Sequence, residues 1–158
     1  NLATAYSELG QYQKALGLIK KAYERRCKVL GEKHPDTLTS LNNLATAYSE
    51  LDEHQKALRV RKKAYGLRCK VLGEDHPHTL TSLNNLAYEY GKHGEYQKAL
   101  ELTKKVYELS CKVLGEDHPH TLTSLNNLAS IYEKQELIEQ EHASLLRRLW
   151  NWMKNLRK

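Results

Sequence analysis

The stretch from Cys69 to Ala87 reads CKVLGEDHPHTLTSLNNLA, and it recurs without change at Cys111–Ala129. The offset is 42 residues, and the segments 41–82 and 83–124 are identical at 29 of 42 positions. Self-similarity at a fixed period of this length is typical of proteins built from stacked repeats. The sequence therefore predicts an array over residues 1–134. Its units are 1–40, 41–82, 83–124, and 125–134 with the helix that follows, because the pattern fails after Tyr132.

Each unit is expected to form two helices, which the second unit illustrates. A first helix is predicted from about residue 36 to residue 51, because Leu38, Leu41 and Leu44 follow a spacing of three residues that marks one helix face. A second helix is predicted over about residues 55–72. Glycines close the second helices, and His-Pro pairs open the next first helices, with the histidines as caps.

Stacking such helix pairs predicts an all-α, right-handed superhelical solenoid. One pair cannot bury both of its faces, so the core is expected between successive units. The alanines at positions 45, 57, 64, 87 and 99 are expected to let the helices approach closely. The first helices are expected to line a concave surface.

Several motifs resemble the tetratricopeptide repeat. L-x-x-L-A-x-x-Y is followed by Y-x-K-A-L, and the linker L-G-x-x-H-P-x-T precedes L-N-N-L-A. The linker and the long period look like the kinesin light chain branch of that superfamily and like bacterial tandem arrays. This resemblance implies a non-catalytic scaffold whose partner is a protein or peptide, without a cofactor.

The resemblance also implies a peptide-binding groove on the first helices. Its main feature is an Asn ladder, whose amides offer both a donor and an acceptor to a peptide backbone. An alternative interpretation is that each Asn bonds to the adjacent repeat. The implied groove residues are Asn1, Thr4, Thr39, Asn43, Thr46, Glu50, Thr81, Asn85, Tyr88, Lys92, Asn127 and Ser130.

The net charge of +6 is concentrated at one end of the chain. Residues 145–158 contain five cations and no acid, so the array itself is nearly neutral. A basic surface of the kind that binds nucleic acid is therefore not expected.

Residues 135–158 are predicted to form a final long amphipathic helix, for which three interpretations stay open. It caps the last repeat, it docks into a groove such as that of a second copy, or it lies on an anionic membrane. Membrane attachment is the least favoured of the three, and docking or open-ended stacking makes the chain a possible homo-oligomer. The apolar residues concerned are Leu145, Leu149, Trp150, Trp152, Met153 and Leu156.

No catalytic constellation is recognisable in the sequence. The two H-P-H triplets, residues 76–78 and 118–120, offer two histidines each, fewer than the four convergent ligands of a structural zinc site. No metal site is therefore expected. The three cysteines fall 42 residues apart, too far in stacked repeats for a disulfide, and are expected to be reduced in the cytoplasm.

Overall fold

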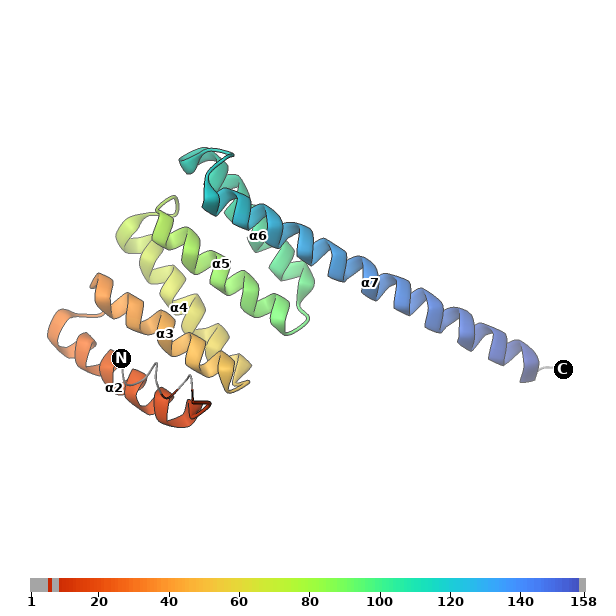
Figure 1. Cartoon of the computed structure of the whole chain (residues 1–158), viewed down its shortest axis with the longest axis horizontal. Coiled ribbons are helices and arrows are strands. Elements are labelled where there is room, and N and C mark those ends of the chain that lie inside the picture. Colours follow the sequence, from red (N-terminus) through yellow and green to blue (C-terminus); the bar gives the residue numbers. More distant parts are fainter. Residues whose placement is uncertain (1–5, 7–8, 157–158) are drawn as a thin grey trace.

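The computed structural model describes residue 6 and residues 9–156, with side chains described up to residue 148. Over these residues the chain forms helices and no strand, and each helix packs against the next one in the chain (Figure 1). The all-α helical repeat solenoid predicted from the sequence is confirmed. The helices are α2 (Tyr12–Leu30), α3 (Pro35–Glu50), α4 (His54–Leu72), α5 (Pro77–Lys92), α6 (Tyr96–Leu114) and α7 (Pro119–Leu156).

The helices begin and end where the local sequence dictates. Each His-Pro pair starts a first helix, because the histidine Nδ1 accepts the backbone N–H two residues further on. The distances are 3.2 Å for His34, 3.1 Å for His76 and 3.1 Å for His118. Pro at the first helical position loses no hydrogen bond there. The predicted helix bounds in the second unit agree with α3 and α4 to within one residue.

Each complete hairpin turns at a residue with positive φ. Gly10, Asp52 and Gly94 have φ values of 69°, 55° and 79°. The corresponding residue of the fourth unit is Glu136, a good helix former that does not favour this conformation. The chain therefore does not turn there. The separate helix that the sequence predicts from residue 135 is instead the continuation of α7, which is 38 residues and about 57 Å long.

The core lies between successive helices of the stack. Ala45, Ala57 and Ala64 are completely buried, as their predicted role in close helix packing requires. Leu41 and Leu44 pack with Ala64 in one cluster. A second cluster further along the array contains the side chains Leu58, Leu86, Tyr90 and Ala99.

The first half of α7 leaves apolar side chains uncovered. Leu122 and Leu125 are 47% and 42% exposed, whereas the equivalent Leu80 and Leu83 of α5 are 4% and 1% exposed. The difference arises because α6 covers that face of α5, whereas none of the described helices covers the equivalent face of α7 (Figure 1). No helix in the described part of the chain is long and apolar enough to cross a membrane.

Candidate functional site

The groove residues implied by the resemblance lie on the first helices of the units. Asn1 and Thr4 fall outside the described residues. The others lie on α3, α5 and α7, and most are exposed. On α3 they are Thr39, Asn43, Thr46 and Glu50; on α5 they are Thr81, Asn85, Tyr88 and Lys92; on α7 they are Asn127 and Ser130.

Four of these residues surround one pocket between α5, α6 and α7. They are Tyr88 and Lys92 of α5 with Asn127 and Ser130 of α7, and Lys134 completes that wall. The pocket has a volume of about 160 Å³. That space suits one or two side chains of a peptide and is smaller than most sites for a small-molecule ligand.

The Asn ladder is partly used within the protein. Asn127 Nδ2 donates a hydrogen bond to Asn84 Oδ1 at 3.1 Å, so this amide links two successive units. Asn84 is the other residue of the Asn-Asn pair, and it lines the same pocket. Asn84 was not among the groove residues predicted from the sequence. The recurrence of an Asn at this position in three successive units could have identified it.

The groove threonines also form hydrogen bonds within their own helices. Thr39, Thr81 and Thr123 donate their hydroxyl hydrogens to the carbonyl four residues earlier, at 2.8 to 3.0 Å. Thr46 makes the same bond to Asn42 at 3.3 Å. These hydroxyls retain lone pairs, so they present acceptors rather than donors to a partner.

Lys92 also bonds to the preceding unit. Its Nζ donates to the carbonyl oxygen of Ser49 at 2.6 Å and lies 3.4 Å from a carboxylate oxygen of Asp52. Those groups lie at the C-terminal end of α3, where a cation is favourable. Lys92 therefore fixes the spacing of two units, and Tyr88, with 64% of its surface exposed, is the side chain most available to a partner.

A second pocket marks a departure from the repeat. In the second unit, Arg68 donates to the His78 carbonyl at 2.9 Å and to the Ser82 hydroxyl at 2.7 Å. Ser110 takes the place of Arg68 in the third unit. The pocket beside Arg68 measures about 70 Å³, and the equivalent one beside Ser110 measures about 180 Å³.

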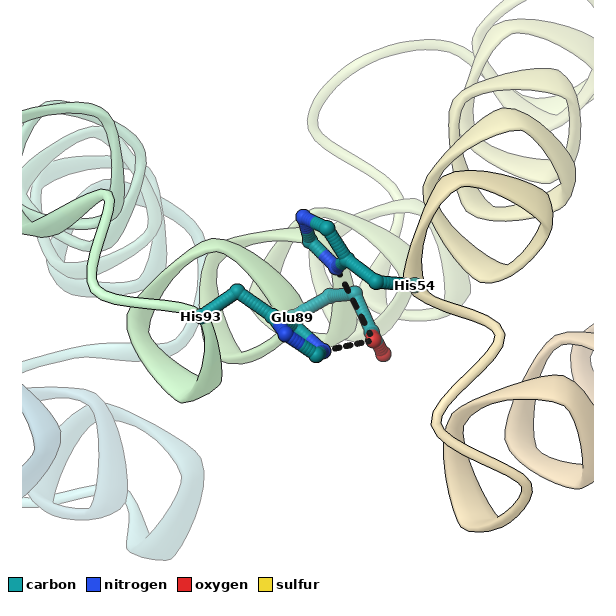
Figure 2. A group of neighbouring side chains, drawn as sticks. All are labelled: His54, Glu89 and His93. Carbon is teal, nitrogen blue, oxygen red and sulfur yellow. Dashed lines mark ion pairs between the residues drawn. The ribbon is translucent and has the colours of Figure 1, made fainter.

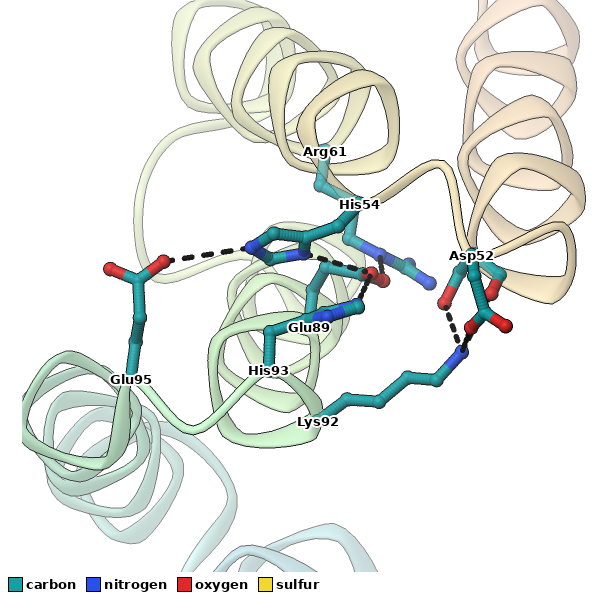
Figure 3. Close-up of polar contacts among 8 residues, drawn as sticks. Asp52, His54, Arg61, Glu89, Lys92, His93 and Glu95 are labelled. Atoms are coloured by element: carbon teal, nitrogen blue, oxygen red, sulfur yellow. Dashed lines mark hydrogen bonds and ion pairs between the residues drawn. The ribbon is translucent and has the colours of Figure 1, made fainter.

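A cluster of ionisable side chains lies between α4 and α5 (Figure 3). Glu89 is fully buried, and its Oε2 accepts from Arg61 Nε at 2.9 Å. Burial alone would raise the pKa of Glu89. The hydrogen bond and charge of Arg61 outweigh that effect, so the pKa of Glu89 lies below its ordinary value. His54 and His93 stack beside this carboxylate with ring centroids 3.4 Å apart.

The sequence analysis missed this cluster because its members are far apart along the chain. Comparison of equivalent repeat positions would have revealed it. Arg61, Glu89 and His93 replace Ile19, Ala47 and Leu51 of the preceding interface. Ionisable residues thus enter together at one place in an otherwise regular array. His54 belongs to the same group, since its equivalents are Tyr12 and Tyr96.

The candidate docking residues of the C-terminal helix do not gather on the array in the part that is described. Leu145 is 53% exposed, and α7 extends past the other helices (Figure 1). Of the candidate residues, only Leu145 has a described side chain, so capping and docking both stay predictions. Leu149, Trp150, Trp152, Met153 and Leu156 lie outside the residues with described side chains.

The chain is similar to known families and solved structures that contain tetratricopeptide-type repeats. Two Tetratricopeptide repeat families match residues 1–70 and 79–120. A kinesin light chain-like protein of Podosopora anserina with nearly identical TPR-like repeats is 33% identical, with a TM-score of 0.76. The similarity covers 93% of this chain and 69% of that one.

BtubC (BKLC) of P. vanneervenii has a TM-score of 0.75 at 21% identity, over 92% of this chain and 58% of that one. This second likeness concerns the fold alone. No curated protein gives a significant match.

Proposed function

Because the chain belongs to the tetratricopeptide-repeat superfamily, with repeats of the kinesin light chain-like kind, we propose that it is a non-catalytic scaffold that binds a peptide segment. Repeats of this superfamily generally mediate protein–protein interaction. The proposed binding surface is the face of the first helices that carries Tyr88, Ser130 and Asn127.

The exposed ring of Tyr88 supports this proposal most strongly. It borders a pocket large enough for a peptide side chain, together with Ser130 and Lys134. Tyr is a frequent anchor at protein interfaces, because it presents a large rigid surface and a polar tip. Thr46 and Ser130 replace Tyr88 in the neighbouring units. The surface therefore varies at the positions that would contact a partner, whereas the linker 72–79 recurs unchanged at 114–121.

A selected peptide tests this function. Peptides are chosen from a displayed library on the intact chain, and their affinity is compared between the wild type and Tyr88→Ala. We expect Tyr88→Ala to weaken binding about 10-fold or more, as for a buried aromatic anchor. Tyr132→Ala is the matched control, since Tyr132 is also an exposed tyrosine but lies outside the pocket. Equal affinity for the wild type and Tyr88→Ala would refute the proposal.

Self-association is the second candidate function, and the uncovered face of α7 favours it. Leu122, Leu125 and Tyr132 are 42–48% exposed at positions where α5 buries its equivalents. A face of this kind on one copy fits a helix of another copy, and such head-to-tail contacts can propagate. Sedimentation of Leu125→Lys against the wild type separates the two ideas. A concentration-dependent mass in the wild type that Leu125→Lys abolishes supports stacking, and a constant monomer mass contradicts it.

A further inference from the structure

Three potential ligand atoms converge between α4 and α5 (Figure 2). Glu89 Oε1 lies 3.6 Å from His54 Nδ1 and 3.3 Å from His93 Nε2. All three atoms lie within 4.8 Å of one another. Glu89 lies in the last turn of α5, His93 directly follows that helix, and His54 is the first residue of α4.

These atoms share a second property, which is that none has a hydrogen-bond partner although each is buried. Burial of a polar atom without a hydrogen bond lowers the stability of a protein, and most buried polar atoms are therefore paired. Arg61 satisfies the other carboxylate oxygen of Glu89 and leaves Oε1 free. Two histidine nitrogens and one carboxylate oxygen therefore converge on one space, joined by ion-pair contacts of 3.6 and 3.3 Å and by no hydrogen bond.

We propose that His54, Glu89 and His93 form a three-ligand site for a first-row transition-metal dication of the zinc class. Zinc binds histidine nitrogens and carboxylate oxygens, at bond lengths near 2.0–2.2 Å. In a tetrahedral site, such bonds separate neighbouring ligand atoms by about 3.3–3.6 Å. The two distances to Glu89 Oε1 meet this requirement.

A carboxylate beside the site supports the required orientation of the His54 ring. On the far side of the His54 ring, Glu95 Oε1 lies 3.6 Å from Nε2 (Figure 3). A carboxylate there favours the proton on Nε2 and so leaves the lone pair of Nδ1 directed into the site. Carboxylates commonly orient metal-binding histidines in this way.

The repeat supplies independent support, because the ligand set occurs at one interface of the array. The equivalent trio between α2 and α3 is Tyr12, Ala47 and Leu51. Between α6 and α7 the trio is Tyr96, Ile131 and Gln135. The stack forms at those interfaces without the glutamate and the two histidines. The fold therefore does not require His54, Glu89 and His93, and a ligand explains why they occur together.

A bound ion would join two units of the array. His54 belongs to the second unit, whereas Glu89 and His93 belong to the third. The side chains of His54 and His93 are 16% and 21% exposed, so an ion can enter and keep one coordination position for water. The site would then stabilise the contact between α4 and α5 against opening.

The test is Zn²⁺ binding to the untagged, metal-free chain by calorimetry, with Co²⁺ absorption as a second readout. We expect one tight site per chain, a raised melting temperature, and a Co²⁺ spectrum of tetrahedral type. His93→Leu and His54→Tyr introduce the residues of the neighbouring interfaces, so both should fold. Each should weaken Zn²⁺ binding about 100-fold or more, and Glu95→Gln about 10-fold.

The matched control is the double variant His78→Asn and His120→Asn, which removes two exposed histidines in the first turns of α5 and α7 that could hold Zn²⁺ adventitiously. It should retain the wild-type affinity and the increase in melting temperature. The proposal is overturned if the wild type binds no Zn²⁺. It is also overturned if His93→Leu and His54→Tyr bind Zn²⁺ as tightly as the wild type. Loss of Zn²⁺ binding in the double control variant would overturn it too.

Discussion

Glu89 and Arg61 form an ion pair whose side chains are 0% and 6% exposed. Buried pairs of this kind contribute little net stability over apolar residues, yet removing one partner leaves an unpaired buried charge. The array contains both an ion pair and an apolar pair at this place, because the equivalent residues in the preceding interface are Ala47 and Ile19. The pair is therefore replaceable as a unit and not one member at a time.

Single and double substitutions at this pair are predicted to differ in how strongly they destabilise the chain. Glu89→Ala should lower the free energy of unfolding by about 3–5 kcal/mol, because Arg61 stays buried without its carboxylate. Adding Arg61→Ile should recover most of that loss. Urea unfolding in the presence of a metal chelator measures both effects. A double variant no more stable than Glu89→Ala would contradict the account of the pair.

The backbone conformation at Gly73 dictates that this residue is glycine. It ends α4 with φ 91° and ψ 161°, a conformation open essentially to glycine alone. A Cβ would meet no atom within 4 Å, so a substitution there acts through the backbone. Gly66 provides the contrast, since it lies within α4 and also faces open space.

Alanine is predicted to have opposite effects at these two glycines. Gly73→Ala should destabilise the chain by about 1–3 kcal/mol through backbone strain. Gly66→Ala should stabilise it by about 0.5–1 kcal/mol, because alanine is the better helix former. Thermal unfolding of the two variants checks the prediction, and equal shifts of both would show that the φ value at Gly73 does not matter.

At the scale of elements, Arg68 and Ser110 show how one substitution changes a helix junction. Arg68 ties α4 to α5 through the His78 carbonyl and the Ser82 hydroxyl. At the junction of α6 and α7, Ser110 is too short to make the equivalent bonds. The larger pocket at that junction occupies the space that an arginine side chain fills in the preceding unit.

Ser110→Arg is therefore predicted to fill the pocket and stabilise the docking of α7 on α6. The expected gain is about 1 kcal/mol, the usual net contribution of a hydrogen bond, because the His120 carbonyl and the Ser124 hydroxyl occupy the places of Arg68's partners. Hydrogen exchange of the α7 amides before residue 135 should slow in this variant. Unchanged or faster exchange would mean that the arginine cannot enter the pocket.

The elements also show what sequence reasoning captured. The period, the His-Pro starts and the glycine ends predicted α3 and α4 to within one residue, because these signals act locally. The long α7 was predicted as two parts because the repeat pattern fails after Tyr132. Glu136 in place of Gly94 or Asp52 was the local signal for one unbroken helix. Sites built from residues of two units were harder to predict from the sequence. Examples are the pairing of Asn127 with Asn84 and the cluster around Glu89.

At the scale of the whole molecule, the array presents two surfaces with different consequences. The first helices bear exposed polar groups around Tyr88, and the last unit bears exposed leucines on α7. The first surface suits a peptide and the second suits another helix. These two surfaces are separate on the molecule, so variants of one should leave the other function intact.

The central claim is that a peptide binds along the first helices. A photo-activated cross-linking amino acid placed singly at positions 46 and 88, and at positions 59 and 101 on the second helices, tests it most directly. With a selected peptide, the account predicts cross-links from positions 46 and 88 and none from positions 59 and 101. Cross-links confined to positions 59 and 101 would place the partner on the other helices and contradict the claim.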